Sequence, residues 1–523
     1  MSWRSIHREL TRSFRKTRAT IQKTESSKPE QLSPDLKQNE LLLKGLFQDC
    51  GDISFHHFCL MEQRRAFLIY QPGLVDRKTL NDSILRPLLE QPKLNHPNLD
   101  LAALGGSVIH SIGQEIATEI AQIIEGILSG KTALLMDGAP EALLIETTGL
   151  DKRAIEEPKA EIATRGPRDS FIEILQVNIA LVRQRIKDSR LKFIFFPAGR
   201  RSKTKIALAY IAGVTPEDLL QEAIERLMQV DMDIILDSGY VEQMIEDKWY
   251  SIFPQLQLTE RPDEVVAALN EGRVAIFTDT SPGVLMAPAT LNTLMHSADD
   301  YYNRWIIGSF IRGFRFFASI FSIVLPALYV SLTSYHPDLL PAKFALAVAG
   351  ARQNIPFPAF LEAFILEAFI ELIREAGLRL PGNLGQAVSI VGGLIIGQAA
   401  VSANLVSPVM LTVVGLTAIS NFSIPNFDAA QAVRVIRFLL MILAAFLGLY
   451  GVVLGIITIF IHLAQLTSFN YSYLSPWAPL QPSDLKDSII RLPWPAMRWR
   501  PQFLRPRQKK RLQDRRKEDP NDY

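Results

Sequence analysis

Residues 384–427 read LGQAVSIVGGLIIGQAAVSANLVSPVMLTVVGLTAISNFSIPNF, 44 consecutive positions without a charged side chain. Residues 438–483 form a second stretch of 46 positions, in which His462 is the only group that could carry a charge. Crossing the hydrocarbon core of a bilayer takes about 20 apolar residues. We therefore expect an α-helical, polytopic membrane domain over residues 301–470. Its predicted spans lie near residues 316–335, 386–404, 406–424 and 435–462.

Positive charge gathers at both ends of the chain. Seven of the first 23 residues are basic, as are ten residues between Arg498 and Lys517. Because basic segments are retained on the cytoplasmic side, we expect both termini to be cytoplasmic and the number of spans to be even, four or alternatively six. The first 23 residues contain no apolar run, so they are not a cleavable signal peptide. The aromatic residues expected at the membrane interface are Tyr301, Tyr302, Trp305, Tyr471, Tyr473 and Trp477.

The region before the membrane domain is a multidomain α/β region. Residues 24–304 carry 29 basic and 41 acidic groups, a balance that disfavours nucleic acid as a partner. Short apolar runs alternate with helix-period segments, and two closely spaced pairs of runs (134–136 with 143–145, and 193–196 with 206–210) predict hairpins and mixed sheets. The predicted organisation is a flexible basic and polar tail at 1–40, α/β subdomains at 41–160 and 161–300, the membrane domain at 301–470, and an extended, Pro-rich, polybasic cytoplasmic tail at 471–523.

Three longer segments show helical periodicity, residues 111–128, 171–187 and 216–230. The third begins with Thr215 as the expected N-cap and Pro216 at the first helical position, followed by acidic residues in the first turn.

Residues 356–375 combine a strongly apolar helix with four glutamates. Glu367, Glu371 and Glu375 are spaced i, i+4, i+8 and form one stripe, with Arg374 beside it, whereas Glu362 lies about 140° away. One interpretation is a helix that lines a water-filled pore, where a homo-oligomer would repeat the stripe as carboxylate rings for cations. The other is an interfacial amphipathic helix with its charges in water. Either interpretation predicts that the stripe faces water, because like charges at i, i+4 repel.

Small and polar residues punctuate the apolar spans. Close helix packing is expected at small residues spaced three or four apart, within a protomer or between protomers. Polar side chains at membrane depth need a hydrogen-bond partner or a conduit, and Pro326 and Pro408 are expected to kink their helices. The packing glycines are Gly393, Gly397, Gly448, Gly451 and Gly455. The polar positions are Gln386, Gln398, Asn404, Asn421 and His462.

The α/β region offers no set of residues for catalysis. Residues 199–205, GRRSKTK, lack the spacing of a phosphate-binding P-loop and fall between two strand-like runs, which predicts a basic hairpin turn. Cys50 and Cys59 are the only cysteines, and with His56 and His57 they are too irregularly spaced for a zinc site. We therefore expect no enzyme, no metal and no cofactor.

Several distinctive sequence motifs are spread over residues 41–479. They lie at residues 73–76, 165–168, 178, 181–185, 199–205, 259–263, 271–274, 300–302, 325–329, 356–358, 374–381, 385–392 and 396–400. On these motifs the chain resembles the A subunits of the GerA-type spore germination receptors. It departs from the family pattern at Thr280, where a glycine is usual, and at residues 465–468, which lack a basic residue.

The resemblance implies a multi-pass protein of the spore inner membrane. It further implies a homo-oligomer that forms a nutrient-gated channel for monovalent cations and acts with two partners, a transporter-like B subunit and a lipoprotein C subunit. The alternatives are a non-conducting scaffold that transmits the signal, and a stage V sporulation paralogue that modulates ion release. A substrate permease is disfavoured, because the sequence shows no inverted repeat with paired broken helices.

Overall fold

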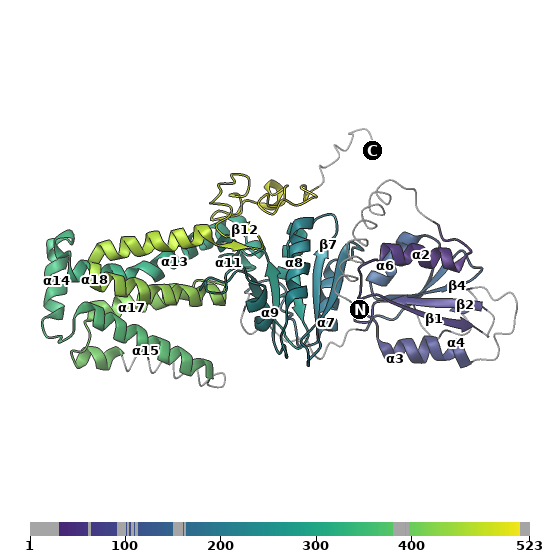
Figure 1. Ribbon diagram of the computed structural model, residues 1–523, viewed down its shortest axis with the longest axis horizontal. Coiled ribbons are helices and arrows are strands. Elements are labelled where there is room, and N and C mark those ends of the chain that lie inside the picture. The colour runs from purple at the N-terminus through teal and green to yellow at the C-terminus, as the bar shows by residue number, and fades with distance from the viewer. Residues whose placement is uncertain are drawn as a thin grey trace.

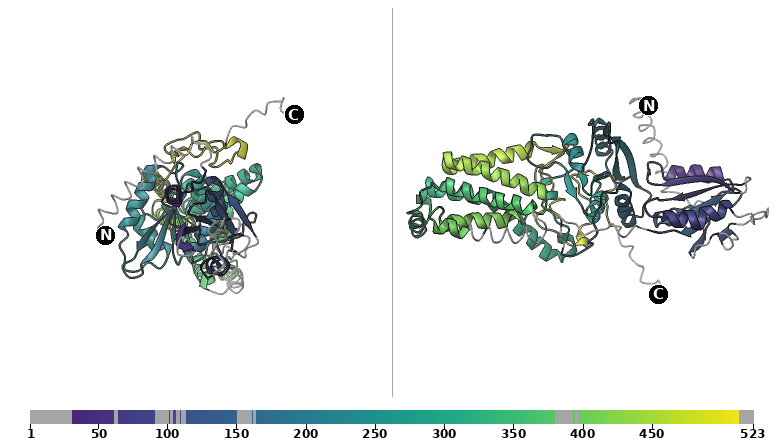
Figure 2. Two further views of the ribbon diagram at one scale, coloured as in Figure 1. Left: turned by 90° about the vertical axis from the view of Figure 1, so that its right-hand side faces the viewer. Right: turned by 90° about the horizontal axis from the view of Figure 1, so that it is seen from below.

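The computed structural model is elongated, and three parts follow one another in chain order (Figure 1). Two α/β units come first and a bundle of helices comes last, an arrangement that is also visible from below (Figure 2). The structure describes residues 31–60, 64–90, 101, 104, 105, 109, 113–149, 161, 164–379, 393 and 397–512.

The first unit is a five-stranded antiparallel sheet in the order β1-β2-β4-β5-β3. Its strands are β1 (Ser54–Leu60), β2 (Arg64–Tyr70), β3 (Gln114–Ala117), β4 (Lys131–Met136) and β5 (Ala142–Glu146). Alternate residues of β2 and β4 point into two separate cores, one on each face of the sheet. One face is covered by α2 (Leu36–Leu46) and α6 (Ile120–Leu128), and the other by α3 (Arg77–Thr79), a π-helix (Leu80–Leu85) and α4 (Arg86–Glu90).

The second unit repeats this topology. Its strands, in the order β6-β7-β9-β10-β8, are β6 (Leu191–Ala198), β7 (Thr204–Ile211), β8 (Gln257–Thr259), β9 (Val274–Thr278) and β10 (Val284–Ala287). One face carries α7 (Leu175–Arg185) and α10 (Pro262–Glu271), and the other carries α8 (Glu217–Gln229) and α9 (Ser238–Ile245). Renumbering β1–β5 as β6–β10 converts one strand order into the other, so the two units are topological copies.

Both predicted hairpins are confirmed, as β4–β5 and β6–β7. The expectation of mixed sheets is wrong, because every pair of neighbouring strands in the two five-stranded sheets is antiparallel. The helix predicted over residues 111–128 is wrong in its first half, because residues 114–117 form the edge strand β3 and α6 begins only at Ile120. The N-cap of α8 is Pro216 rather than Thr215. The Thr215 hydroxyl instead accepts a hydrogen bond from the Ile211 amide, 3.3 Å away, and so closes the turn after β7.

The helical domain follows the short helices α11 (Leu291–Leu294) and α12 (Asp299–Tyr302). It comprises α13 (Trp305–Ser334), a 3₁₀ turn (Pro337–Leu339), α14 (Ala342–Arg352), α15 (Ala359–Arg379), α17 (Pro408–Asn421) and α18 (Phe427–Gln465). Pro408 does not kink a helix but begins α17, where the Ser407 hydroxyl caps the Met410 amide at 3.1 Å. The described residues contain two helices, α13 and α18, that are long and apolar enough to cross a membrane.

The helix α18 folds back on itself at Gly448, whose φ of 58° and ψ of −138° interrupt the helix. A Cβ atom at Gly451 would lie 2.1 Å from the Leu443 carbonyl oxygen, and one at Gly455 would lie 2.3 Å from Leu440. In a continuous helix those pairs would be roughly 12 and 22 Å apart along the axis. The expectation of one long span over residues 435–462 is therefore wrong, because the glycines pack the two halves of α18 together.

The tail after α18 is not extended as the sequence predicts. It forms the short β11 (Thr467–Ser468) and β12 (Tyr471–Ser472) and a 3₁₀ turn (Trp494–Ala496), and it then returns to the second unit. Leu504 is fully buried, and the Arg500 side chain donates a hydrogen bond to the Asn270 carbonyl at the end of α10. Its many prolines preclude regular structure, but arginine contacts to backbone carbonyls hold it in place.

Candidate functional site

The glutamates of α15 lie inside the helical domain and face arginines. Glu362, which is fully buried, accepts a hydrogen bond from Arg352 Nε of α14 at 3.0 Å and a second from the Ser407 amide at 2.9 Å. The second contact fixes the start of α17. Glu362 therefore links three helices at the end of the bundle remote from the α/β units.

Glu367 is the centre of the site. Arg437 Nη1, on the first half of α18, donates to both of its carboxylate oxygens at 2.7 and 2.9 Å, and both side chains are buried. The expectation that Glu367 faces water is wrong. The repulsion between like charges along α15 is offset by the opposite charge on a neighbouring helix.

Toward the α/β units the pairs become more exposed. Glu371 accepts from Arg374 at 3.3 Å and from Arg434 at 3.4 Å, and its side chain is 30% exposed. Glu375 pairs with Arg379 at 2.6 Å on the surface. We call the three inner steps, Glu362–Arg352, Glu367–Arg437 and Glu371 with Arg374 and Arg434, the ion-pair ladder.

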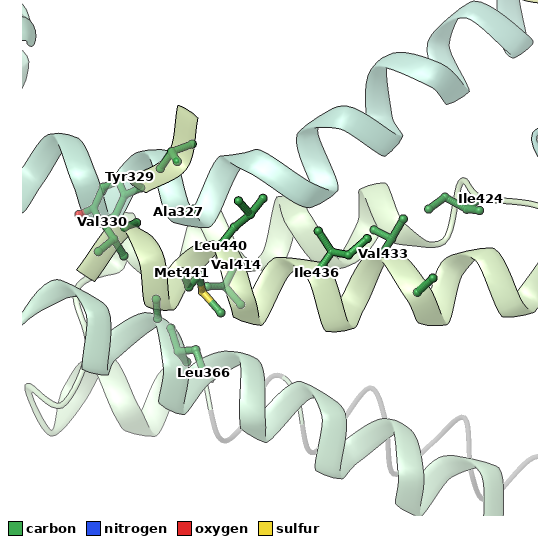
Figure 3. Close-up of a cluster of buried hydrophobic side chains, with 14 of the residues drawn as sticks. Ala327, Tyr329, Val330, Leu366, Val414, Ile424, Val433, Ile436, Leu440 and Met441 are labelled. Carbon is green, nitrogen blue, oxygen red and sulfur yellow. The ribbon is translucent and has the colours of Figure 1, made fainter. Parts of the chain in front are cut away.

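Apolar side chains surround the ladder. Leu366 of α15, Val414 of α17 and Met441 of α18 belong to one buried cluster between the helices (Figure 3). Within the ladder, Arg437 Nε and Nη2 and Arg374 Nη2 are buried and have no hydrogen-bond partner among the described residues. Buried donors of this kind are normally satisfied by water or by another chain.

Sequence reasoning placed Arg374 beside the stripe but missed the other arginines of the ladder, Arg352, Arg434 and Arg437. Arg434 and Arg437 are the only arginines or lysines between Arg379 and Lys486. Two positive charges in so long an apolar region need carboxylate partners. The glutamates of α15 form the nearest cluster of several acidic residues in the sequence. That charge balance was the signal.

The ladder ends at a cavity of about 400 Å³ between the helical domain and the second unit, here called the junction cavity. Arg374 and Arg434 line it from the bundle, and Arg261, Glu161 and Glu264 line it from the second unit. Burial raises the pKa of Glu161 to about 7. Burial, and next the charge of Glu161, raises the pKa of Glu264 well above its usual range. Burial therefore favours the neutral, protonated form of both carboxyl groups.

A buried charge network fastens α13 beside this cavity. Asp300 accepts from Arg312 at 3.0 Å and from Arg315 at 2.9 Å, both on α13. Arg312 also pairs with Asp487 of the tail at 2.8 Å, and Arg491 donates to the Asp300 carbonyl. The consecutive helices α12 and α13 and the tail, which is distant in sequence, are thereby held at one point.

The remaining candidate residues are distributed as follows. Asn421 is buried and its side-chain oxygen accepts from Ser322 at 3.3 Å, and His462 lies 3.0 Å from Ser251 of the second unit. Gln398 and Asn404 are exposed, and Gln386 lies outside the described residues. A Cβ at Gly397 would touch Leu411 of α17 at 3.4 Å, whereas Gly393 has open space.

The two other motifs of the α/β region remain separate from this site. Of residues 199–205, the first five form the β6–β7 turn and the last two begin β7. Arg200 is paired to Asp231 and Arg201 to Asp233. Cys50 is buried and Cys59 is exposed. Within the described part of the chain, no group of three or more histidine, cysteine or acidic side chains could hold a metal ion.

Fold and site together define a membrane-associated protein in which an α/β region is joined to a helical domain that contains internal ion pairs. The sequence model described as "Bacillus/Clostridium GerA spore germination protein" matches residues 42–503. The chain belongs to this family, the A-subunit family of spore germination receptors.

Relatives extend over nearly the whole chain. The uncharacterized membrane protein YfkQ of Bacillus subtilis (strain 168) is 42% identical over 92% of this chain and 93% of its own. Spore germination protein KA of the same organism is 39% identical over 92% of this chain and 88% of its own. Spore germination protein A1, also of that organism, is 43% identical over 88% of this chain and 92% of its own. A crystal structure of the N-terminal domain of the A subunit of the Bacillus megaterium spore germinant receptor GerK3 aligns with a TM-score of 0.41 at 31% identity. It covers 51% of this chain and 99% of that one.

Proposed function

We propose that this chain is an A-type germination receptor subunit whose helical domain forms, as a homo-oligomer, a nutrient-gated channel for monovalent cations. It acts in the spore inner membrane with a transporter-like B subunit and a lipoprotein C subunit, and both of its termini are cytoplasmic. The observation that carries the proposal is the ion-pair ladder, which runs from Glu362 through an apolar bundle to the junction cavity.

Charges inside a membrane domain are costly and usually mark an ion or proton pathway. The unpartnered donors of Arg437 and Arg374 support the presence of water along the ladder. In this closed arrangement Arg437 neutralises Glu367, so cation passage requires the two side chains to separate. Glu371 and Glu375 are the carboxylates that an oligomer would present to the pore as rings, because they are partly exposed.

The direct test replaces Glu371 and Glu375 with glutamine and measures potassium efflux from vesicles that contain the reconstituted receptor. We expect germinant-stimulated efflux to fall severalfold at unchanged protein level. The matched control is Glu225→Gln on α8, which removes one surface carboxylate far from the ladder. Equal efflux from the double variant and the control would contradict the proposal.

A non-conducting, signal-transmitting scaffold is the second candidate, and the complete burial of Glu362 and Glu367 favours it. Glu367→Gln alone is a poor discriminator, since it leaves Arg437 buried without its partner and destabilises the fold. The paired variant Glu367→Gln with Arg437→Gln removes both charges. A channel gated by this pair becomes leaky without germinant, whereas a scaffold still passes no ions.

A further inference from the structure

The second α/β unit presents a group of exposed aromatic and aliphatic side chains next to the helical domain. In the loop after α9, Trp249 is 83% exposed, Tyr250 60% and Ile252 43%. Tyr240 and Met244 of α9 are also exposed. We call residues 249–252 the aromatic loop.

The base of the aromatic loop is fixed, so its exposed tip is held outward. The buried Gln255 side chain accepts from the Lys248 amide at 2.9 Å and donates to the Lys248 carbonyl at 2.8 Å. The Trp249 and Tyr250 rings meet edge to face, with centroids 6.0 Å apart. Solvent exposure of two rings on such a rigid base is unfavourable unless something covers them.

The loop lies level with the last turn of α18. Ser251 Oγ is 3.0 Å from His462 Nε2, and Lys248 Nζ donates to the Gln465 carbonyl at 2.6 Å. Phe460 and Ile461, immediately before His462, are 60% and 53% exposed on the outer face of α18. The apolar surface of α18 therefore continues onto the aromatic loop.

We infer that the aromatic loop inserts into the headgroup region of the lipid bilayer and anchors the second α/β unit to the membrane surface. Tryptophan and tyrosine favour this region, because their rings are apolar and their N–H or O–H groups reach water. The aromatic residues that the sequence suggests as anchors are largely engaged elsewhere. Tyr473 is fully buried, and the Tyr301 and Tyr302 hydroxyls donate to Asp487 and Asp263.

Lipid is the partner that we infer for the aromatic loop, because the apolar surface of α18 continues onto it. The same bilayer that covers Phe460 and Ile461 reaches the loop without a further protein. The inference depends on the membrane placement of α18 and not on ion conduction, so the two proposals fail independently. An α/β unit anchored in this way would transmit a tilt of the bundle directly to its own sheet.

The test measures tryptophan fluorescence of the full chain in phospholipid vesicles, with and without lipid brominated near the headgroup. The difference between wild type and Trp249→Phe isolates the Trp249 signal. We expect bromolipid to quench this signal by at least about half, as for a ring among the headgroups. The control is Trp499→Phe, since Trp499 adjoins Arg500 on the α10 side of the second unit and its signal should be unaffected.

Two outcomes would overturn the inference. Trp249 fluorescence that bromolipid leaves unchanged and aqueous iodide quenches would place the loop in water. Protection from iodide only when a second receptor subunit is co-expressed, without quenching by bromolipid, would assign the surface to a protein partner. Loss of the bromolipid effect in Trp249→Phe at an unchanged protein level, with the effect retained in Trp499→Phe, would support the inference.

Discussion

The two α/β units have the same strand order, yet the second one has a buried charged residue at a position where the first has a partly exposed one. The N-cap of α6 in the first unit is Glu119, which is half-buried. The equivalent N-cap of α10 is Arg261, which is 2% exposed and donates to Asp263 at 2.8 Å and to the Pro167 carbonyl at 3.2 Å. One topology thus serves as a peripheral unit and as a junction.

The difference lies in the loops rather than in the sheets. Both sheets bury aliphatic and aromatic side chains on each face. Only the surroundings of the second unit, within the described residues, bring together the tail, α12, α13 and α18. Charged groups at such a crossing are buried as pairs, because the attraction between opposite charges offsets the cost of removing each from water. Variants that remove individual buried charges, and so change the stability of one unit more than that of the other, therefore test this comparison.

The largest effect is expected from Asp300→Ala at the junction. Removing this carboxylate leaves Arg312 and Arg315, both buried, without their shared partner. Breaking a buried pair costs about 3–5 kcal/mol. We expect a clear fall in the thermal unfolding midpoint of the detergent-solubilised protein and less full-length chain in the membrane.

The control for Asp300→Ala is Asp231→Ala, which removes the exposed partner of Arg200 at the β6–β7 turn. Exposed pairs are screened by water, so its midpoint should not change measurably. Similar midpoints for both variants would show that the buried network does not stabilise the junction.

A somewhat smaller effect is expected where the two units meet. Asp52 of the first unit accepts from Arg183 Nε and Nη2 of α7 at 2.8 and 2.9 Å, and both side chains are buried. Asp52→Ala should cost about 3 kcal/mol by leaving Arg183 unpaired. We expect faster amide hydrogen exchange in β1 and β2 and unchanged exchange in α13. Faster exchange in α13 as well would mean that the units do not behave separately.

Sequence patterns predicted the local structure better than the pairing between distant elements. The runs that became β4, β5, β6 and β7 were correct because adjacent hairpins are encoded by short-range alternation. The sequence wrongly predicts helix for the edge strand β3, since its residues Gln114–Ala117 carry no alternation that separates them from the helix that follows. The duplicated strand order was not visible, because topology depends on contacts between strands far apart in the chain.

The candidate site shows the same limit. The helical spacing of the glutamates in α15 was correctly read, as a face of one helix. The α18 partners of Glu371 and Glu367 lie 63 and 70 positions away, and no periodicity connects them. The reversal of α18 at Gly448 was hidden as well, because a glycine within an apolar run also fits close helix packing.

A third prediction concerns the pH dependence of stability, which we expect to arise where the second unit meets α18. Burial raises the pKa of Glu242 to about 8, with further contributions from the charges of Asp428, Glu246 and Asp237. Burial also raises the pKa of Glu246 to about 7. The folded state thus holds protons that the unfolded state releases above pH 4.5. Stability is fully present below that pH and falls as the pH rises toward 8.

The measurement is the unfolding midpoint of the full chain between pH 5 and 8. Each retained proton contributes a slope of at most about 1.4 kcal/mol per pH unit. Glu242→Gln should flatten the profile, because glutamine stays neutral throughout. Glu225→Gln on the exposed side of α8 serves as the control, and a profile that Glu242→Gln leaves as steep as this control would assign the pH dependence to other groups.

The smallest effect is expected at the β6–β7 turn, the basic motif of the second unit. A phosphate-binding loop offers free backbone N–H groups at the start of a helix. Here the Arg200 and Arg201 amides donate to the Met232 and Asp233 carbonyls, and the turn joins two antiparallel strands. We therefore expect the purified full chain to release no phosphate from ATP or GTP above the protein-free blank, and Lys203→Ala to change neither this nor the unfolding midpoint. Turnover that Lys203→Ala abolishes would show that this turn binds phosphate despite its occupied amides, and the second unit would then be a nucleotide site as well as a junction.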